Sequence, residues 1–285
     1  MKFKAFVKIL QFLPKKIAHK LLFFKIMGEK LDLKNPKTLN EKIQWLIINR
    51  YGIKEANLSD KVLSKKILKN KNIDKLEFPK TLYCIENVKK ENINELKEKL
   101  PDRFVLKCNH GSGNVFVCQN KNEFDFKGKL NILKKDLKKD YSRNFLEYHY
   151  ALIKPRIFFE EYLDDSFNPV PLDYKFFCFN GEAKVVMVCS GRKNGKYDAT
   201  FFDENWNTLN YSTHPSKQKI VKPTNLSKMF EIASELSKDS TFVRIDLYNI
   251  NGKIYFGEMT FTPAAGMSKT YTDEADRIMG DMLKL

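Results

Sequence analysis

Cysteine and histidine are scarce in this sequence of 285 residues, and neither forms a motif. The five cysteines are an odd number without a CxxC pair, and the four histidines are scattered along the chain. This distribution argues against a disulfide framework and against a zinc site of the usual spacing. We therefore expect a cytoplasmic protein whose thiols are reduced and either buried or incidental.

Long apolar runs are absent as well. No stretch reaches the roughly eighteen apolar residues that a membrane-spanning helix needs, so the sequence predicts none. The apolar N-terminus is interrupted by lysines and no small-residue cleavage site follows it, so we expect no signal peptide. With 42% hydrophobic residues, the chain is long enough to bury the core of one large domain or of two to three small ones.

Arginine contributes only seven of the 51 basic residues, although these outnumber the 35 acidic residues and give a net charge of +16. The lysines are spread along the chain, and no basic segment alternates with aromatic residues, so we expect no nucleic-acid partner. Two interpretations of the charge remain. It belongs to a lysine-rich surface that keeps the protein in solution, or it serves an anionic partner such as ATP, an acidic glycan or a membrane.

Residues 1–28 predict two short, basic, amphipathic helices that are separated near Pro14. The helices either pack on the body of the protein or lie against the inner face of a membrane, and the sequence leaves both possibilities open. A further helix follows Asn35, where Thr38 and Glu41 have the spacing of a capping box.

The rest of the chain alternates between the two kinds of secondary structure. Helices are expected at 59–69, 88–100, 123–139, 225–238 and 273–284, strands at 81–84, 104–107, 115–118, 156–163, 172–179 and 183–189, and a polar loop at 190–198. Turn residues between several of the strands favour hairpins. The pattern predicts a mixed α+β fold with mainly antiparallel strands.

Four polar residues stand on two strand-like runs near the C-terminus, at 242–248 and 256–261. Side chains alternate along a strand, so Arg244 shares a face with Asp246, and Glu258 shares a face with Thr260. Two carboxylates beside an arginine suit Mg²⁺ held against a polyphosphate, with the guanidinium on a free phosphate oxygen.

The turn between these strands decides whether the two acids share a face. A two-residue turn at Asn251-Gly252 would place Asp246 and Glu258 on opposite faces. A three-residue loop at 250–252 would place them on the same face, and it needs a left-handed residue at its last position, where Gly252 stands. We predict the three-residue loop and a shared metal site.

A second candidate segment is a strand that ends at Lys107, followed by a glycine loop, His110-Gly111-Ser112-Gly113. Glycines let the backbone approach phosphate oxygens, and the lysine can neutralise their charge. The lysine precedes the glycines, so this is neither a Walker loop nor a dinucleotide-binding fingerprint. An ordinary flexible hairpin explains the segment equally well.

Two further strands carry candidate nucleotide contacts. Glu160, Glu161 and Leu163 stand where a strand can present amide groups and an acid to an adenine edge. Asp173 and Lys175 share a strand face and suit ribose hydroxyls and a phosphate. A cross-strand ion pair would account for the second pair as well.

Taken in order, these segments resemble the ATP-grasp superfamily, and D-alanine–D-alanine ligases have a similar ending. The sequence is most similar to the ATP-grasp family named for teichuronopeptide biosynthesis. The similarity covers roughly residues 35 to 266. It is carried by Asn35-Pro-Lys-Thr-Leu-Asn-Glu-Lys-Ile-Gln-Trp-Leu, Leu106-Lys-Cys-Asn-His-Gly-Ser-Gly, Asp173-Tyr-Lys-Phe-Phe-Cys-Phe-Asn-Gly, Arg244-Ile-Asp-Leu-Tyr and Phe256-Gly-Glu-Met-Thr-Phe.

The resemblance implies a helical N-terminal region at 1–100 with a reduced substrate domain, a mobile lid at 101–162 and a C-terminal antiparallel-sheet subdomain at 163–285, the last two gripping ATP. It also implies roles for residues. Lys107 and the 110–113 loop would hold phosphates, Glu160 and Leu163 would meet the adenine and Asp173 the ribose, Arg244 would touch the transferred phosphoryl group, and Asp246 and Glu258 would bind one or two Mg²⁺ ions. Thr260 replaces the usual asparagine ligand, which leaves the second ion less secure.

The activity implied is that of an ATP-dependent carboxylate–amine ligase that works through an acyl phosphate, with Lys175 and Arg244 spreading the charge of the phosphates. The family name suggests that an amino acid or amine is joined to a uronic acid of a surface or capsular polysaccharide. A glycosyltransferase, a sugar or lipid kinase, and a non-catalytic protein that binds nucleic acid or membrane remain as alternatives.

Overall fold

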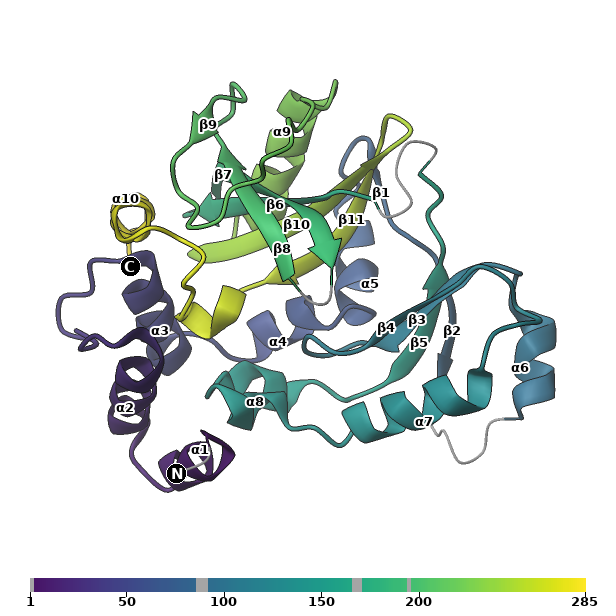
Figure 1. The fold of residues 1–285 in the computed structure, drawn as a ribbon, viewed down its shortest axis with the longest axis horizontal. Helices are drawn as coiled ribbons and strands as arrows, with labels where there is room; N and C mark the ends of the chain where they lie inside the picture. The colour runs from purple at the N-terminus through teal and green to yellow at the C-terminus, as the bar shows by residue number, and fades with distance from the viewer. Residues whose placement is uncertain (1–2, 86–91, 166–170, 194–195) are drawn as a thin grey trace.

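The structure is a computed structural model that describes residues 3–85, 92–165, 171–193 and 196–285. It is an α+β protein with two sheets that face each other across the middle of the molecule (Figure 1). Helices α4 (Ile53–Ser59) and α5 (Leu63–Lys69) lie between the sheets. In the described residues, no helix is long and apolar enough to cross a membrane.

The large sheet has seven strands in the order β1-β11-β10-β6-β7-β8-β9. Its strands are β1 (Leu76–Glu77), β6 (Asp173–Phe179), β7 (Glu182–Lys193), β8 (Lys196–Phe202), β9 (Thr208–Leu209), β10 (Phe242–Ile250) and β11 (Lys253–Thr260). Neighbours are antiparallel except for β1 and β11. The expected polar loop at 190–198 is wrong for most of its length, because β7 and β8 continue their pairing beyond Ser190.

Helices cover both faces of the large sheet, and this determines where its polar residues lie. One face packs on α9 (Leu226–Ser237) through Val243, Ile245 and Leu247 of β10. The opposite face packs on α3 (Leu39–Asn49) and α10 (Asp273–Met282) around Phe242. Residues 244 and 246 alternate with the first set, so they point away from α9.

The small sheet has the order β2-β5-β3-β4, all antiparallel. Its strands are β2 (Thr81–Ile85), β3 (Phe104–Cys108), β4 (Val115–Cys118) and β5 (Ile157–Glu161). Helices α6 (Ile93–Lys99) and α7 (Phe126–Asp136) cover one face with a separate core. Segment 76–85 joins both sheets, because β1 lies in the large one and β2 in the small one.

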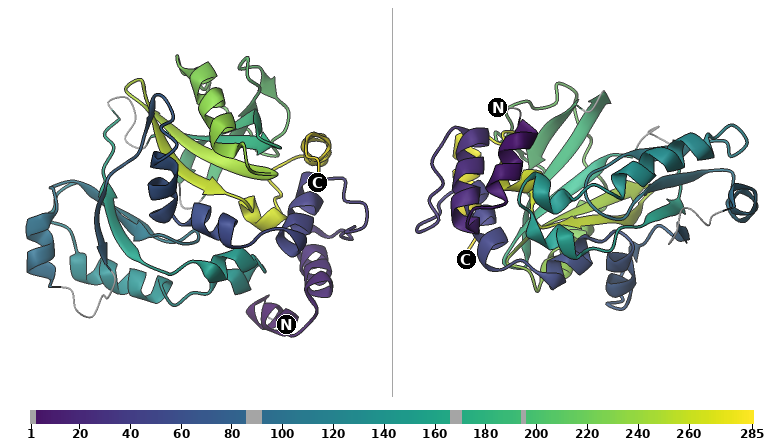
Figure 2. Two further views of the ribbon diagram at one scale, coloured as in Figure 1. Left: turned by 180° about the vertical axis from the view of Figure 1, so that it is seen from behind. Right: turned by 90° about the horizontal axis from the view of Figure 1, so that it is seen from below.

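The N-terminal region packs as two helices, α1 (Phe3–Leu10) and α2 (Lys15–Met27), separated at Pro14 as predicted. Their inner residues contact Leu146 and Met267, near α8 (Tyr141–Asn144) and the short helices η1 (Tyr148–Leu152) and η2 (Pro263–Gly266). Figure 2 shows this helical layer beside the C-terminal helix. The capping box of α3 is present, with Thr38 accepting from the backbone N–H of Glu41.

One expected helix begins later than predicted, at Leu63. The lysine-rich segment 59–69 is interrupted, because the Asp60 carboxylate accepts hydrogen bonds from the backbone N–H groups of Val62 and Leu63 at 2.9 and 3.0 Å. An aspartate that bonds to the backbone in this way begins a helix rather than continuing one. The break places Lys61 in a connecting segment between α4 and α5.

Candidate active site

The hairpin between β10 and β11 ends in a two-residue turn. Asn251 and Gly252 have positive φ angles of 51° and 79°, and the turn pairs Ile250 with Lys253. The predicted three-residue loop is therefore wrong. An asparagine followed by a glycine favours this tighter turn, because both central residues must be left-handed.

A β-bulge at Gly257 nevertheless brings the two predicted metal-binding acids to the same face. Leu247 pairs with Phe256 and Asp246 pairs with Glu258, so Gly257 is an extra residue in β11. The extra residue reverses the alternation beyond it. A Cβ on Gly257 would lie 2.8 Å from the carbonyl oxygen of Asp246, so the bulge depends on glycine.

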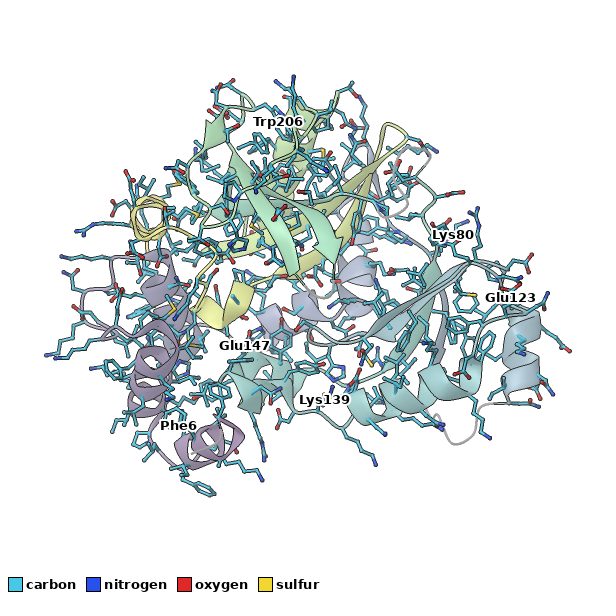
Figure 3. All side chains as sticks on the ribbon, in the orientation of Figure 1. Phe6, Lys80, Glu123, Lys139, Glu147 and Trp206 are labelled. Atoms are coloured by element: carbon cyan, nitrogen blue, oxygen red, sulfur yellow. The ribbon has the colours of Figure 1, made fainter. Side chains whose placement is uncertain are left out.

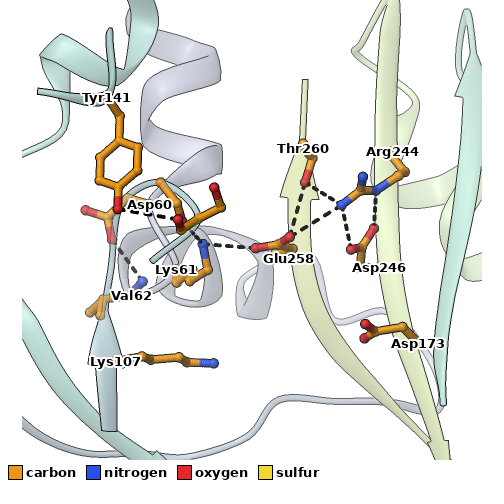
Figure 4. A network of polar contacts seen from close by, with 12 residues as sticks. Asp60, Lys61, Val62, Lys107, Tyr141, Asp173, Arg244, Asp246, Glu258 and Thr260 are labelled. Carbon is orange, nitrogen blue, oxygen red and sulfur yellow. Dashed lines mark hydrogen bonds and ion pairs between the residues drawn. The ribbon is translucent and has the colours of Figure 1, made fainter. Parts of the chain in front are cut away.

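Asp246 pairs with two cations, of which Figure 4 shows Arg244. Arg244 forms a fork with it, with Nε 2.7 Å from Oδ1 and Nη2 2.8 Å from Oδ2. Lys175 pairs with the same carboxylate and lies 3.5 Å from Asp173. Burial lowers the pKa of Lys175, but the carboxylates of Asp246, Asp173 and Glu258 together outweigh this, and the pKa lies above its usual value.

Glu258 connects the hairpin to the segment between α4 and α5. Lys61 Nζ lies 2.9 Å from its Oε2, while Arg244 Nη2 and the Thr260 hydroxyl lie 3.5 and 3.4 Å from its Oε1. Burial raises the pKa of Glu258, but Lys61, Lys175 and Arg244 hold it far below its usual range. The carboxylate is therefore charged at neutral pH.

Lys61 is a site residue that sequence reasoning missed. Besides its ion pair, its Nζ donates a hydrogen bond of 3.0 Å to the carbonyl oxygen of Gly111. It is held in place by Asn109, whose side chain donates to Asp60 at 2.8 Å and whose carbonyl accepts from the Lys61 backbone at 3.0 Å. The segment contains many lysines, so Lys61 does not stand out from its neighbours. The aspartate before it, which interrupts the helix, is the sequence feature that could have drawn attention to it.

The glycines of the 110–113 loop are required by an aromatic ring as well as by backbone geometry. Gly111 has a φ of 63°, and a Cβ there would lie 2.6 Å from the ring of Tyr141. A Cβ on Gly113 would lie 2.9 Å from the Tyr141 hydroxyl, which donates to the carbonyl of Ser112. His110 is buried beneath the loop, edge-on to the same ring.

Lys107 points at an acid from the neighbouring strand. Its Nζ lies 2.5 Å from Glu160, and Lys65 Nζ lies 2.8 Å from the other oxygen of this carboxylate. Burial raises the pKa of Glu160, but the two lysines outweigh it and the pKa lies below its usual value. Lys65 is a second residue that the sequence did not single out.

Most of the predicted residues meet in one cavity of about 700 Å³ between the two sheets. Its lining includes Lys107, Gly111, Ser112, Gly113, Glu160, Glu161, Leu163, Asp173, Lys175, Asp246 and Glu258, together with Lys61. His110, Arg244 and Thr260 are not part of this lining. The cavity is large enough for a nucleotide.

Arg244 and Thr260 instead line a second cavity of about 400 Å³. Lys61, Gly111, Ser112 and Glu258 line both cavities, so the two adjoin at these residues. We call the residues that line both cavities the shared wall. Within the second cavity, Arg244 donates a hydrogen bond of 3.2 Å to Thr260 Oγ1.

The loop that follows β11 forms much of the second cavity, and α3 holds it. Gln44 Nε2 donates to the carbonyls of Ala265 and Gly266 at 2.6 and 3.2 Å. Asn40 donates to the carbonyl of Ser268 at 3.1 Å and accepts from its backbone N–H at 2.9 Å. The α3 segment therefore does more than cap a helix, because it fixes a cavity wall.

Asp246 and Glu258 are suited to binding a Mg²⁺ ion that is also bound by the phosphates of a nucleotide. Asp246 and Glu258 supply hard carboxylate oxygens on one face, and Thr260 Oγ1 lies beside them. Across the described ranges, no group of three or more His, Cys, Asp or Glu residues is arranged to hold a metal. Mg²⁺ commonly takes one or two carboxylates and completes its shell with substrate phosphates and water, so two acids fit this ion.

The family model described as TupA-like ATP-grasp matches residues 41–284. The chain belongs to this family. It therefore has the ATP-grasp fold and is an ATP-grasp ligase, with ATP as a substrate. A comparison with curated proteins gave no match.

Solved structures similar to this TupA-like ATP-grasp protein include three ligases. The D-alanine–D-alanine ligase from Bacillus anthracis complexed with ATP is 18% identical with a TM-score of 0.48, covering 80% of this chain and 65% of that one. The D-alanine–D-alanine ligase from Helicobacter pylori is 15% identical with a TM-score of 0.45, covering 86% and 69%. VanG D-Ala:D-Ser ligase from Enterococcus faecalis is 11% identical with a TM-score of 0.45, covering 85% and 61%.

Proposed function

We propose that this ligase activates a carboxylate as an acyl phosphate and joins it to an amine, with a uronic acid of a surface polysaccharide or its precursor as the carboxylate. The observation that carries this proposal is the joining of two cavities at one charged wall, formed by Lys61 and Glu258 with the glycine loop. ATP occupies the larger cavity, and the acceptor groups approach through the smaller one.

In the larger cavity, the backbone N–H groups of the 110–113 loop and Lys107 hold phosphate oxygens. Asp173 takes the ribose hydroxyls, and the segment at 161–163 lies along the adenine edge. Glu160 positions Lys107, because the two side chains form a buried ion pair. Residues 101–162 act as the lid and 163–285 as the base, with β2 moving as part of the lid sheet.

Asp246 and Glu258 hold Mg²⁺, with Thr260 beside them. The ion supplies charge neutralisation for the phosphates, one or two ions being compatible with this set. Arg244, Lys175 and Lys61 pair with these carboxylates, so their positive charges lie beside the place where the phosphates would bind. Three cations on one polyanion provide the electrostatic stabilisation that phosphoryl transfer needs.

The reaction proceeds at the wall shared by the cavities. An acceptor carboxylate oxygen attacks the γ-phosphorus, an O–P bond forms and ADP leaves. The neutral amine nitrogen then attacks the carbonyl carbon, a C–N bond forms, the C–O bond to the phosphoryl group breaks, and phosphate leaves with the proton that the nitrogen gives up. Arg244 lies on the acceptor side of the wall, where it can stabilise the transferred phosphoryl group. The enclosing lid keeps water from the acyl phosphate.

The uronate acceptor is supported by charge and by the family resemblance. The net charge of +16 favours an acidic glycan. The test is incubation of the protein with ATP, Mg²⁺, a panel of uronates and a panel of amino acids. We expect ADP formation that requires both a uronate and an amine, and ADP formation that requires neither would contradict the assignment.

We also propose that α1 and α2 bring the protein to the anionic inner face of a membrane. The inner faces of both helices pack on the body of the protein, as the first of the two interpretations of residues 1–28 expected. The two helices and the turn between them expose apolar side chains at positions 3, 9, 12, 13, 17, 21 and 24. Lysines alternate with them in the sequence, and this combination is typical of helices that lie in a membrane interface. A cytoplasmic location with peripheral membrane contact follows.

A further inference from the structure

The second cavity contains an acid that the phosphate chemistry does not use. Glu147 lies between α8 and η2 (Figure 3) and lines the cavity. The other charged residues of the lining, Lys61, Arg244 and Glu258, all belong to the network at the shared wall. Glu147 is therefore the charged residue of this lining that lies outside that network.

Glu147 has a hydrogen bond but no counter-charge. The Thr262 hydroxyl donates to its Oε1. Among the residues that the structure describes, no lysine, arginine or histidine forms an ion pair with it. Burial raises the pKa of the Glu147 carboxyl to about 7, and the bond from Thr262 offsets only part of this effect. A cation that entered the cavity would supply the missing partner.

The surroundings of Glu147 are fixed by an unusual stretch of backbone. Ala264 and Ala265 have positive φ angles of 49° and 55°, a conformation that non-glycine residues rarely adopt. Gln44 holds this turn through the carbonyl of Ala265. Such conformations persist only where the surrounding structure enforces them, and they cluster at ligand sites.

The rest of the lining is mainly apolar. Phe145, Met259, Met267 and Ile26 contribute to it, and α2 reaches the cavity through Ile26. A largely apolar pocket with one acid that lacks a cationic partner fits a molecule with a cationic amino group and a short carbon skeleton.

We infer that this cavity is the binding site of the amine co-substrate. The Glu147 carboxylate pairs with the nitrogen of the amine, and the Thr262 hydroxyl orients the Glu147 carboxylate. This inference rests on the proposed ligase function and names the residues that recognise one substrate of that reaction. An acceptor carboxylate would be repelled by Glu147 and attracted by Lys61 and Arg244, so it lies at the shared wall.

The test is the Glu147→Gln variant, which keeps the size of the side chain and a partner for Thr262. Binding of L-lysine, L-alaninamide and ethanolamine is measured by NMR titration in the presence of ATP and Mg²⁺, with their N-acetylated forms as neutral probes. We expect the wild type to bind at least one amine but not its acetylated form. The variant should bind that amine about tenfold to a hundredfold more weakly, as expected for loss of a charged hydrogen-bond partner.

Glu123→Gln is the matched control, because it makes the same change on an exposed residue between β4 and α7 (Figure 3). It should leave amine binding unchanged, and both variants should bind ATP as the wild type does. Equal amine binding by wild type and Glu147→Gln, or no amine binding by the wild type, would overturn the inference. Amine binding without any ligase turnover would count against the proposed function alone.

Discussion

Gly257 determines the geometry of the metal site although it contributes no side chain. Without the bulge, the tight turn would pair Asp246 with this glycine and leave Glu258 on the other face. Both acids and the turn residues can be read from the sequence. The length of the turn and a bulge in a strand each shift the pairing of the strands by one residue, so one can offset the other. The conclusion that the acids share a face is confirmed, while the loop length from which it was predicted is wrong.

Replacing Gly257 by alanine should therefore weaken binding of ATP in the presence of Mg²⁺ by at least about tenfold, which corresponds to about 1.4 kcal/mol. The added Cβ would lie 2.8 Å from the Asp246 carbonyl, and the strand must shift to relieve the contact. Isothermal titration calorimetry measures the affinity, and circular dichroism checks the fold. Gly252→Asn is the control, because asparagine tolerates a positive φ and no atom lies within 4 Å of a Cβ there. Equal losses in both variants would show that the bulge has no special role.

Glu258→Gln should abolish turnover and also change the pH dependence of stability. The folded protein holds the pKa of Glu258 below the value of about 4.3 that it has in an unfolded chain. Its ionised form therefore stabilises the fold above that value, and this contribution is lost as the pH falls through the lower folded pKa. Thermal melts should show a lower Tm for the variant at pH 7 and a smaller difference near pH 3. Near-normal turnover would remove Glu258 from the metal site.

Helix α3 shows how an element remote from the nucleotide shapes the acceptor side. Its motif is recognisable in the sequence, and its capping box is confirmed. What the sequence could not show is that Gln44 and Asn40 reach residues more than two hundred positions later in the chain. Contacts of this range follow from the packing of α3 against η2 and α10.

Gln44→Leu should raise the KM for the amine while leaving ATP affinity unchanged. The substitution removes two hydrogen bonds to the loop at 265–266 and costs about 1–3 kcal/mol of stability. Steady-state kinetics with each substrate varied in turn provides the measurement. Lys42→Met is the control, because Lys42 on the same helix bonds to the carbonyls of Gly280 and Leu283 instead. A raised KM for ATP in the Gln44 variant, with that for the amine unchanged, would contradict the assignment.

At the scale of the whole molecule, two sheets face each other and the N-terminal helices form a separate outer layer (Figures 1 and 2). The charged residues of the predicted site line the cavity between the sheets. The antiparallel α+β class and most of the strands could be predicted from alternation and turn residues. The order of the strands could not be predicted, because β2 joins the small sheet from a part of the chain that precedes the other strands of that sheet. Lys61 was missed for the same reason, since it reaches the site only through the packing of α4 and α5 between the sheets.

The outer layer should mediate binding to anionic membranes. Phe12 and Phe24 are 88% and 56% exposed, so the double substitution Phe12→Ser and Phe24→Ser should reduce binding to vesicles that contain phosphatidylglycerol. Co-sedimentation at low and high salt is the measurement, with neutral vesicles for comparison. Val221→Ser is the control, because Val221 is 76% exposed outside the N-terminal helices. A wild-type protein that does not co-sediment with anionic vesicles would disprove a membrane role.

Calorimetric titration of the folded protein with ATP, with and without Mg²⁺, tests the central claim most directly. The account predicts binding that is strengthened by Mg²⁺ in the wild type, with the Mg²⁺-dependent part lost in Glu258→Gln. Two results would contradict the account: folded wild-type protein that binds no ATP in the presence of Mg²⁺, or folded wild-type protein that binds ATP equally well with and without Mg²⁺.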